Sequence, residues 1–489
     1  MMAMKKLALV PLMGVLFTGC LMGPDYQRPP VTSPEQYYMA QGPAEAKSLA
    51  DLPWWEVFDD PLLKNLVDEA LKNGFDARIA AARVEESRAR YGIEKSRYYP
   101  QLDYRLGVDR NKLPSIDGNA TDSQARTLYS ANVGLNWEID LWGRIRRLNE
   151  AAKAQYLATE EAQRGVLLSL TSDVATAYFQ LRELDVELEI AKRTTLAFQD
   201  TYDLFYRRLE GGAASTLETS RAEANLRSVA AQIPEIERAI VAKENQINFL
   251  LGRNPQTIVR DEPMPSLPPP IPAGLPSQLL ERRPDVRQAE DEMIAANANI
   301  GAAKADFFPT LSLTGIFGYA SNDLNDLVSS GNFYSFGLGL LGPLFQGGKL
   351  KRQYEAVKWQ WEQAKIQYEA TVTNAFGEVS TFLTDRMKLE TTVEQRMLAV
   401  NSYEEAVRVA NLRYLSGLSS YFEVLDAESE LFPAENLLAQ TRRDQFLAVV
   451  NLYRALGGGW QVEEQNGLPG EEAPAPADQP PTPTTPPTN

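Results

Sequence analysis

The sequence predicts an α+β chain, built twice from one unit, in which short membrane-type β-strands lead into very long coiled-coil helices. Three observations predict it. Residues recur at a fixed offset between the two halves, each half has two segments of about ten residues with alternating polarity, and each half has an apolar seam far longer than a globular helix needs. Both halves follow the same order of helix, strand pair and long helical hairpin.

The composition excludes several kinds of site. The chain has 489 residues, a net charge of −16, one Cys and no His. Without His it cannot hold a Ser/His/Asp or Cys/His catalytic group or a His-ligated metal, and one Cys cannot close an internal disulfide or build a Cys-based metal centre. We therefore expect no metal and no cofactor. The acidic balance also argues against nucleic acid as a partner, because binding phosphates requires a basic face.

Residues 1–19 have the pattern of a lipoprotein signal peptide. A positive start is followed by an apolar run at 7–17 that is too short to span a bilayer, and then by Phe-Thr-Gly-Cys, in which only the Phe departs from a lipoprotein box. We expect Cys20 to become the acylated N-terminus and to anchor the chain in outer-membrane lipid, since several acyl chains together anchor stably. Leu21 after the Cys favours sorting to the outer membrane in bacterial lipoproteins. The alternative is an ordinary signal peptide cleaved near Gly19, with the Cys incidental.

The internal repeat sets the domain boundaries. Six residues between 80 and 102 recur 209 positions later, and thirteen between 143 and 252 recur 205 positions later. A constant offset over so long a stretch predicts one structural unit used twice, at 61–255 and 277–460. The remaining segments are an extended periplasmic arm, a Pro-rich connector between the units, and an acidic Pro-rich tail that we expect to be disordered: 20–60, 256–276 and 461–489.

Each unit begins with a helix and continues with a strand pair. The stretch 62–97 is rich in Ala, Arg and Glu and contains no Pro, which favours helix, and Pro100 ends it. Apolar and polar residues then alternate in the strand pair at 101–140, and less regularly in the pair at 310–345. Segments of about ten residues with one apolar face are typical of transmembrane β-strands. Periodicity alone leaves half-buried strands of a soluble sheet as an alternative.

Each strand pair is followed by a predicted coiled-coil hairpin, at 144–251 and 349–456. From Leu167 to Leu209 the apolar positions are spaced three and four residues apart without a break, which predicts a coiled-coil seam. A continuous helix from Arg144 to Leu209 would be about 100 Å long at 1.5 Å per residue. No globular core requires a helix of that length.

The strand count requires assembly. Each chain offers four candidate strands, whereas a sheet edge cannot face lipid and the smallest closed bacterial barrels have about eight strands. Two chains would close a barrel filled by side chains, and three would leave room for an aqueous lumen. Long helices that continue from these strands would then form a hollow tube.

Four segments resemble a known family. The box ending in Cys20, GPDYQRP at 23–29, LPSQLLERRPDVRQAE at 275–290 and FFPTLSLTG at 307–315 together resemble the outer membrane factors of tripartite efflux pumps. The chain looks closest to the OprM-like, NodT-type outer membrane lipoproteins of the TolC superfamily, which serve resistance-nodulation-division (RND) transporters. The resemblance covers essentially all of the mature chain except the tail.

The resemblance implies a TolC-like fold and a passive efflux function. It implies a homotrimer with a 12-stranded β-barrel, continued by a coiled-coil α-barrel in the periplasm, that docks onto a periplasmic adaptor protein and an inner-membrane RND transporter. Such a trimer is an outer-membrane exit channel for drugs, solvents or other small toxic molecules and is gated at the periplasmic tip of its helical tunnel. Three copies of an apolar residue would narrow the pore, while rings of acidic residues would favour cations.

The predicted gate lies at the helix turns farthest from the strands. The repeat places Gly212 and Gly417 at equivalent turns, where Gly permits the left-handed conformation that ends a helix. The resemblance places an apolar gate residue at Phe422 and acidic gate residues at Glu423 and Asp426. Acidic residues brought close across a three-fold axis repel, so closure requires counter-charges or a bound cation. The remaining candidates are the repeat partner of the first gate acid and three basic residues that could neutralise the acids: Glu218, Arg207, Arg208 and Arg413.

Three other functions fit parts of the pattern. A TolC-like exit duct for type I protein secretion shares the architecture and differs in its inner-membrane partner. A periplasmic adaptor has one long hairpin flanked by β-domains, whereas this chain has two hairpins with strand pairs between them. An enzyme is disfavoured, because carboxylates adjacent in sequence point in different directions and no phosphate loop or metal-ligand spacing is present.

Overall fold

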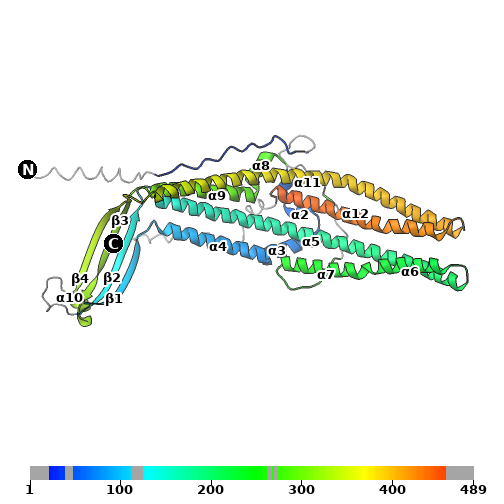
Figure 1. Ribbon diagram of the computed structural model, residues 1–489, viewed down its shortest axis with the longest axis horizontal. Helices are drawn as coiled ribbons and strands as arrows, with labels where there is room; N and C mark the ends of the chain where they lie inside the picture. The colour runs from blue at the N-terminus through cyan, green and yellow to red at the C-terminus, as the bar shows by residue number, and fades with distance from the viewer. Residues whose placement is uncertain (1–20, 39–47, 113–124, 261–266, 269–273, 459–489) are drawn as a thin grey trace, which may run out of the picture.

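The computed structural model describes residues 21–38, 48–112, 125–260, 267–268 and 274–458. The predicted signal peptide, Cys20, the tail and much of the predicted connector lie outside these residues. The described chain is strongly elongated, with a four-stranded sheet at one end and the turns of two helical hairpins at the other (Figure 1).

The helical stretch predicted at 62–97 is divided into α3 (Pro61–Asn73) and α4 (Phe75–Ser96). The break falls at Gly74, where a Cβ atom would lie 2.4 Å from the Ala70 carbonyl oxygen and 2.8 Å from the Leu250 carbonyl oxygen. Only glycine allows the backbone to pass this close, so the helical stretch is divided at this residue. The equivalent helix of the second half is divided into α8 (Pro276–Arg282) and α9 (Pro284–Ala305), because Pro284 cannot continue α8. Two short elements precede α3, η1 (Leu49–Asp51) and α2 (Trp54–Val57).

The sheet is an antiparallel meander in the order β1-β2-β3-β4. Its strands are β1 (Gln101–Asn111), β2 (Arg126–Ile139), β3 (Thr310–Ser321) and β4 (Asn332–Leu341). Strands β2 and β3 belong to different halves of the chain and pair from Tyr129 opposite Ser321 to Ile139 opposite Leu311. The last strand ends at Leu341, four residues before the predicted end of the strand pair. The turn between β3 and β4 carries η2 (Leu324–Asp326) and α10 (Leu327–Ser330).

The apolar face predicted for the first strand is open in this chain. Leu102, Tyr104, Leu106 and Val108 alternate along β1 and are between 65% and 81% exposed. Most of the surface of these side chains is left uncovered by the described residues of one copy. Their exposure is the pattern that a strand face requires if lipid or another copy is to cover it.

The longest helices are equivalent. Helix α5 (Arg144–Glu210) and helix α11 (Lys349–Leu415) each have 67 residues and lie 205 positions apart, as the repeat predicts. Each starts after a glycine with positive φ, Gly143 at 77° and Gly348 at 86°. None of the helices within the described ranges combines the length and the hydropathy that crossing a membrane demands.

The two returning arms of the hairpins differ. In the second half, α12 (Tyr421–Ala455) is one helix that passes through Pro433. In the first half the return is divided into α6 (Thr216–Ala230) and α7 (Gln232–Leu250). Pro234 stands at the third position of α7 and lacks the N–H that would bond the Ala230 carbonyl, so the break falls where a helical hydrogen bond is missing.

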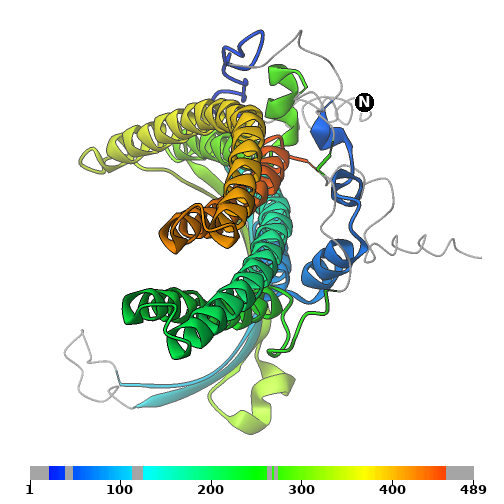
Figure 2. The same cartoon turned by 90° about the vertical axis from the view of Figure 1, so that its right-hand side faces the viewer.

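The hairpins form an arc when the chain is viewed from their turns (Figure 2). Neighbours in the arc are α6 and α7 against α5, α5 against α12, and α12 against α11. Helices α9 and α4 pack on α5 toward the sheet, and α9 also packs on α11. The arc therefore ends in α6 and α7 on one side and in α11 on the other.

The main core lies midway along the molecule, where the short helices meet the long ones. The Phe179 ring of α5 stacks on the Phe446 ring of α12 with centroids 4.6 Å apart, and the Phe58 ring contacts Phe179 at 5.1 Å. The buried Tyr178 hydroxyl donates to Asp60, which also caps α3. This core ties the two halves together and leaves the hairpin turns projecting far beyond it.

Candidate functional site

The two hairpin turns have the same backbone structure. Gly212 and Gly417 both have φ +71°, the left-handed conformation that glycine adopts without strain. The Ala213 N–H donates to the Arg208 carbonyl at 2.7 Å, and the equivalent bond in the second turn is 2.8 Å long. This bond and the one from the glycine N–H form a Schellman motif that satisfies the last carbonyls of the long helix. Both helices therefore stop abruptly and reverse at the same level.

An aromatic cluster joins the hairpins just inside the turns. The Phe205 ring of α5 lies 4.1 Å from the Tyr421 ring of α12, and the Tyr421 and Tyr414 rings lie 5.4 Å apart. Val424 and Leu425 are buried in the same cluster. The cluster holds α12 against α5, so any outward movement of the second hairpin must separate these rings.

The predicted gate acid Glu423 has a counter-charge within its own chain. Arg413 Nε donates to Glu423 Oε2 at 3.3 Å across the second turn, and both side chains are about half exposed. Arg413 was one of three basic candidates for this position. Because the pair is solvated and has one hydrogen bond, its attraction is weak.

The other two basic candidates are placed differently. The Arg208 guanidinium donates to the Tyr414 hydroxyl and lies 5.1 Å from the centre of that ring, so it supports the aromatic cluster. Arg207 is exposed, and its side chain makes no hydrogen bond or ion pair with any residue that the structure describes. Of the three basic side chains, only Arg413 is paired with a gate acid in the single chain.

Phe422 and Asp426 point away from the aromatic cluster. Phe422 is 59% exposed, unlike its neighbour Tyr421, which is buried. Asp426 is also exposed. An exposed apolar ring beside exposed carboxylates is what a pore constriction requires once copies surround it.

Arg221 was missed by the sequence reasoning. Its guanidinium lies over the Phe422 ring, 6.0 Å from the centroid, and so connects α6 of the first hairpin to the predicted gate residue of the second. The signal was present in the repeat, because Arg221 occupies the position equivalent to Asp426, with the opposite charge.

Glu218 is part of the first turn itself. Its carboxylate accepts from the Ser215 N–H at 2.7 Å and from the Ser215 hydroxyl at 2.9 Å, forming a capping box at the start of α6. These two hydrogen bonds hold the pKa of Glu218 below its usual range, with a further contribution from the positive charge of Arg208. Glu423, its repeat partner, pairs with Arg413 and forms no such box, so the two turns carry equivalent acids in different environments.

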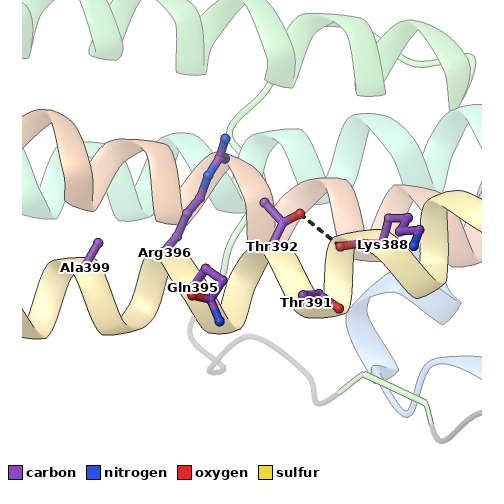
Figure 3. Close-up of a pocket in the computed structure, with 6 residues that line it drawn as sticks. All are labelled: Lys388, Thr391, Thr392, Gln395, Arg396 and Ala399. Atoms are coloured by element: carbon purple, nitrogen blue, oxygen red, sulfur yellow. Dashed lines mark hydrogen bonds between the residues drawn. The ribbon is translucent and has the colours of Figure 1, made fainter.

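Two grooves among the residues that the structure describes lie away from the tip. One runs along the middle of α11 and is lined by polar and basic side chains between Lys388 and Ala399 (Figure 3). Arg396 on this helix reaches across to α12, where it donates to the Leu437 carbonyl and to Thr441. Within the described ranges, no group of His, Cys, Asp and Glu side chains is arranged to hold a metal ion.

A second cluster joins two of the sequence segments that carry the family resemblance. Tyr26 and Arg28, from GPDYQRP, bind Glu290, the last residue of LPSQLLERRPDVRQAE. The Tyr26 hydroxyl donates at 3.0 Å and the Arg28 Nε at 2.7 Å, while a second Arg28 nitrogen donates to Glu281 at 2.5 Å. The two segments are therefore partners in space.

The beginning of the described chain is fixed beside the sheet. The Met22 N–H donates to the Trp142 carbonyl just after β2, at 3.2 Å. Buried Arg147 donates to the Met22 carbonyl at 3.0 Å and to Asp25 at 2.8 Å. Gly23 has φ +93° and passes so close to Gly301 that a Cβ atom would lie 2.4 Å from its Cα. The arm thus starts at the strand end of the molecule.

Comparisons with known proteins agree with this architecture. A family model described as outer membrane efflux protein matches residues 66–253 and 275–458. The solvent efflux pump outer membrane protein SrpC of Pseudomonas putida is 37% identical over 94% of this chain and 100% of the relative. The cation efflux system protein CusC of Escherichia coli is 35% identical over 91% of this chain and 96% of the relative. A solved structure of the outer-membrane channel OprN matches with a TM-score of 0.84 at 30% identity, covering 90% of this chain and 100% of that one.

Proposed function

This chain belongs to the outer membrane efflux protein family, and we propose that three copies of it form a channel that is closed at the hairpin tips. It is an outer-membrane efflux channel of the TolC superfamily that extends into the periplasm and serves as the exit duct of a tripartite pump. Type I protein secretion, the alternative considered from the sequence, is set aside because the relatives are efflux components.

The homotrimer is supported by the two open ends of the arc. Helices α6 and α7 end it on one side and α11 on the other, so a neighbouring copy can add its α6–α7 edge to this α11 edge (Figure 2). Contacts of this head-to-tail kind generate a ring when the rotation closes. The same rotation joins the outer strands β1 and β4 of neighbouring copies, and three sheets of four strands complete a 12-stranded barrel. Outer-membrane fractionation with a trimer that survives SDS supports this assembly, and a soluble monomer contradicts it.

The tip gate rests on one observation above all. Phe422 is 59% exposed beside the exposed acids Glu423 and Asp426, whereas Tyr421, the residue before it, is buried against Phe205. In a trimer, three Phe422 rings narrow the pore, and the acids around them repel anions. Glu218, Gly212 and Gly417 hold the shape of the turns that carry these residues.

The test of the gate is single-channel conductance in planar bilayers. Replacing both acids, Glu423→Ala with Asp426→Ala, takes the counter-charge away from Arg413 and leaves its unpaired positive charge at the tip in all three copies, so conductance rises and the preference for cations falls. Unchanged conductance and unchanged ion preference contradict the gate. Engineered Cys pairs that cross-link neighbouring hairpins at the turns should block efflux and leave trimer assembly intact, because opening requires the hairpin around Gly417 to swing outward.

Acylation of Cys20 completes the proposal for the N-terminal arm. The support is the position of the arm, because Met22 is fixed beside the end of β2 and a lipid attached just before it begins next to the membrane strands. Loss of metabolic palmitate labelling in a Cys20→Ala variant, with labelling in the parent protein, tests this. Equal labelling in both contradicts it.

The partners follow from the family and from the passive character of the channel. We infer that the tips meet a periplasmic adaptor and an RND transporter in the inner membrane, which supplies the energy and selects the substrate. The chain then needs no catalytic group, and it acts as a duct and not as an enzyme. One relative is named for solvent efflux and another for cation efflux, so membership of the family does not specify the substrate. The substrates of this channel, among drugs, solvents and other small toxic molecules, are identified by the susceptibility of a deletion strain.

A further inference from the structure

Glu428 of α12 occupies an apolar interface. It lies three residues after Leu425 and four before Phe432, so the three side chains face the same side of the helix. Leu425 belongs to the aromatic cluster at the tip, and Phe432 belongs to the next cluster below it, with Phe198 of α5 and Leu226 of α6. The Glu428 carboxyl is therefore placed between two apolar clusters that hold α12 to the first hairpin.

The carboxyl lacks the partners that other acids of this interface have. Its Oε2 atom is buried and has no hydrogen-bond partner among the residues that the structure describes. Two other acids between the hairpins are bound by arginines: Arg193 donates to Glu435 at 2.5 Å, and Arg443 donates to Glu183 at 2.6 Å. Glu428 lies nearer the tip than these two acids and differs from them, because its buried oxygen has no such partner among the described residues.

The charged groups around Glu428 do not neutralise it. Helix α12 packs on α5 and α11, and the pairs Phe205–Tyr421 and Arg193–Glu435 place the α5 residues near 200 at the level of Glu428. The charged side chains at this level on the two helices are exposed or bound elsewhere: Asp200 and Asp203 on α5, and Glu404, Glu405 and Arg408 on α11. Asp203 accepts from Gln199, and Arg408 pairs with Glu405. On α12 itself Asp426 and Glu430 are exposed, and Tyr421 interacts with Glu428 while burial raises the pKa of its hydroxyl.

Burial without a counter-charge favours the protonated carboxyl. Desolvation raises the pKa of Glu428 to about 7. If α12 separates from α5 at the tip, water reaches the carboxyl and its pKa returns toward the ordinary value for Glu. The closed tip therefore binds a proton more tightly than the open tip does.

We propose that Glu428 makes opening of the tip depend on pH, with the neutral side chain holding α12 against α5 and the ionised side chain favouring their separation. This inference rests on the proposed gate and assigns it a regulatory group. The direction of this pH effect, and the pH range in which it occurs, follow from the difference between the pKa values of Glu428 in the closed and open tips. Below the pKa of the closed state the acid is protonated in the closed tip and imposes little strain, and above it a charge must stay buried for the tip to stay closed. With pKa values near 7 closed and 4.5 open, the open-to-closed ratio rises about tenfold per subunit from pH 6 to pH 8.

The experiment compares two isosteric variants at equivalent positions of the repeat. Glu428→Gln keeps the shape and removes the titration. Glu223→Gln is the matched control, because Glu223 is the repeat partner of Glu428 but is half exposed and lies 3.6 Å from Arg227. Open probability in planar bilayers is measured at pH 6, 7 and 8, together with hydrogen exchange of residues 421–432, corrected for the intrinsic effect of pH.

The parent channel and Glu223→Gln should open more, and exchange faster in α12, as the pH rises. Glu428→Gln should stay closed across the range. Retention of the full pH response in Glu428→Gln, or its absence in the parent channel by both measurements, overturns the inference.

The double variant of Glu423 and Asp426 separates this result from the gate itself. If it changes conductance while Glu428→Gln behaves like the parent, the gate stands and proton control fails. If it changes nothing while exchange of α12 still depends on Glu428, the proton-dependent packing stands and the constriction lies elsewhere.

Discussion

Arg28 and Glu290 join two segments that are 262 residues apart in sequence, through a hydrogen bond of 2.7 Å from Nε to Oε1. Arg28 is partly exposed and Glu290 mostly buried, and a second Glu290 oxygen accepts from the same guanidinium. This planar, two-bond contact is the arrangement in which an arginine–carboxylate pair is strongest. It fixes the N-terminal arm to α9 in the part of the molecule where both halves of the repeat meet.

We expect Arg28→Ala to release the arm without unfolding the hairpins. The loss should be about 2 kcal/mol, the usual value for hydrogen bonds to charged groups. Limited proteolysis should then cleave between residues 23 and 38 faster than in the parent protein. Glu281→Gln is the control, because Glu281 is 65% exposed and accepts only one bond from Arg28. Equal cleavage in parent and Arg28→Ala would show that the arm is held by other contacts.

Arg147 and its repeat partner Arg352 provide a second matched pair. The Arg147 side chain is 2% exposed and binds Met22, Asp25 and Glu150, whereas Arg352 is 80% exposed and, among the residues that the structure describes, binds Glu355 alone. Arg147→Ala should lower the free energy of unfolding by about 3 kcal/mol, because a buried guanidinium and its hydrogen bonds to three residues are lost. Arg352→Ala should change it by less than about 0.5 kcal/mol. Thermal unfolding of the two purified variants measures the difference, and equal losses would contradict the role assigned to the arm.

Local spacing was sufficient to predict the long helices and the strands. The three-and-four spacing from Leu167 to Leu209 predicts α5 because a helical seam depends only on which neighbours share a face. The alternation of apolar and polar residues from Leu102 to Val108 predicts β1, because every second side chain of a strand lies on the same face. The repeat then carried these predictions to the second half, and the turns at Gly212 and Gly417 followed from it.

Contacts between distant segments could not be predicted in this way. The break at Gly74 depends on the approach of the Leu250 carbonyl, which belongs to another helix. The burial of the Glu428 Oε2 atom depends on which hairpin faces α12, since the repeat partner Glu223 has the same local sequence position and is half exposed. At the candidate gate, the sequence proposed three basic partners for the acids. Only the folded chain distinguishes Arg413, which reaches Glu423, from Arg208, which binds Tyr414.

The first turn allows a test of backbone strain alone. Gly212 has φ +71° and Gly211 has φ −80°, and a Cβ at either position would meet no close contact. Gly212→Ala should therefore destabilise the turn by about 1 to 2 kcal/mol, the cost of left-handed backbone for a residue with a Cβ. Gly211→Ala should have little effect. Hydrogen exchange of residues 208–216 measures both. Similar exchange in the two variants would mean that the turn relaxes to another conformation.

Variants of Arg413 and Glu423 can test whether repulsion between acidic residues destabilises the closed tip. Removing the positive charge by Arg413→Ala leaves three Glu423 carboxylates and three Asp426 carboxylates facing one axis in the proposed trimer, so repulsion should favour opening. A half-exposed pair contributes about 0.5 kcal/mol, which for three subunits changes the open-to-closed ratio about tenfold. Single-channel recordings should show higher conductance and stronger cation preference, and both effects should shrink at high salt. Adding Glu423→Gln to Arg413→Ala should restore closure, because the repelling charge is gone. If the double variant remains as open as Arg413→Ala, the arginine closes the tip through packing of its side chain and not through its charge.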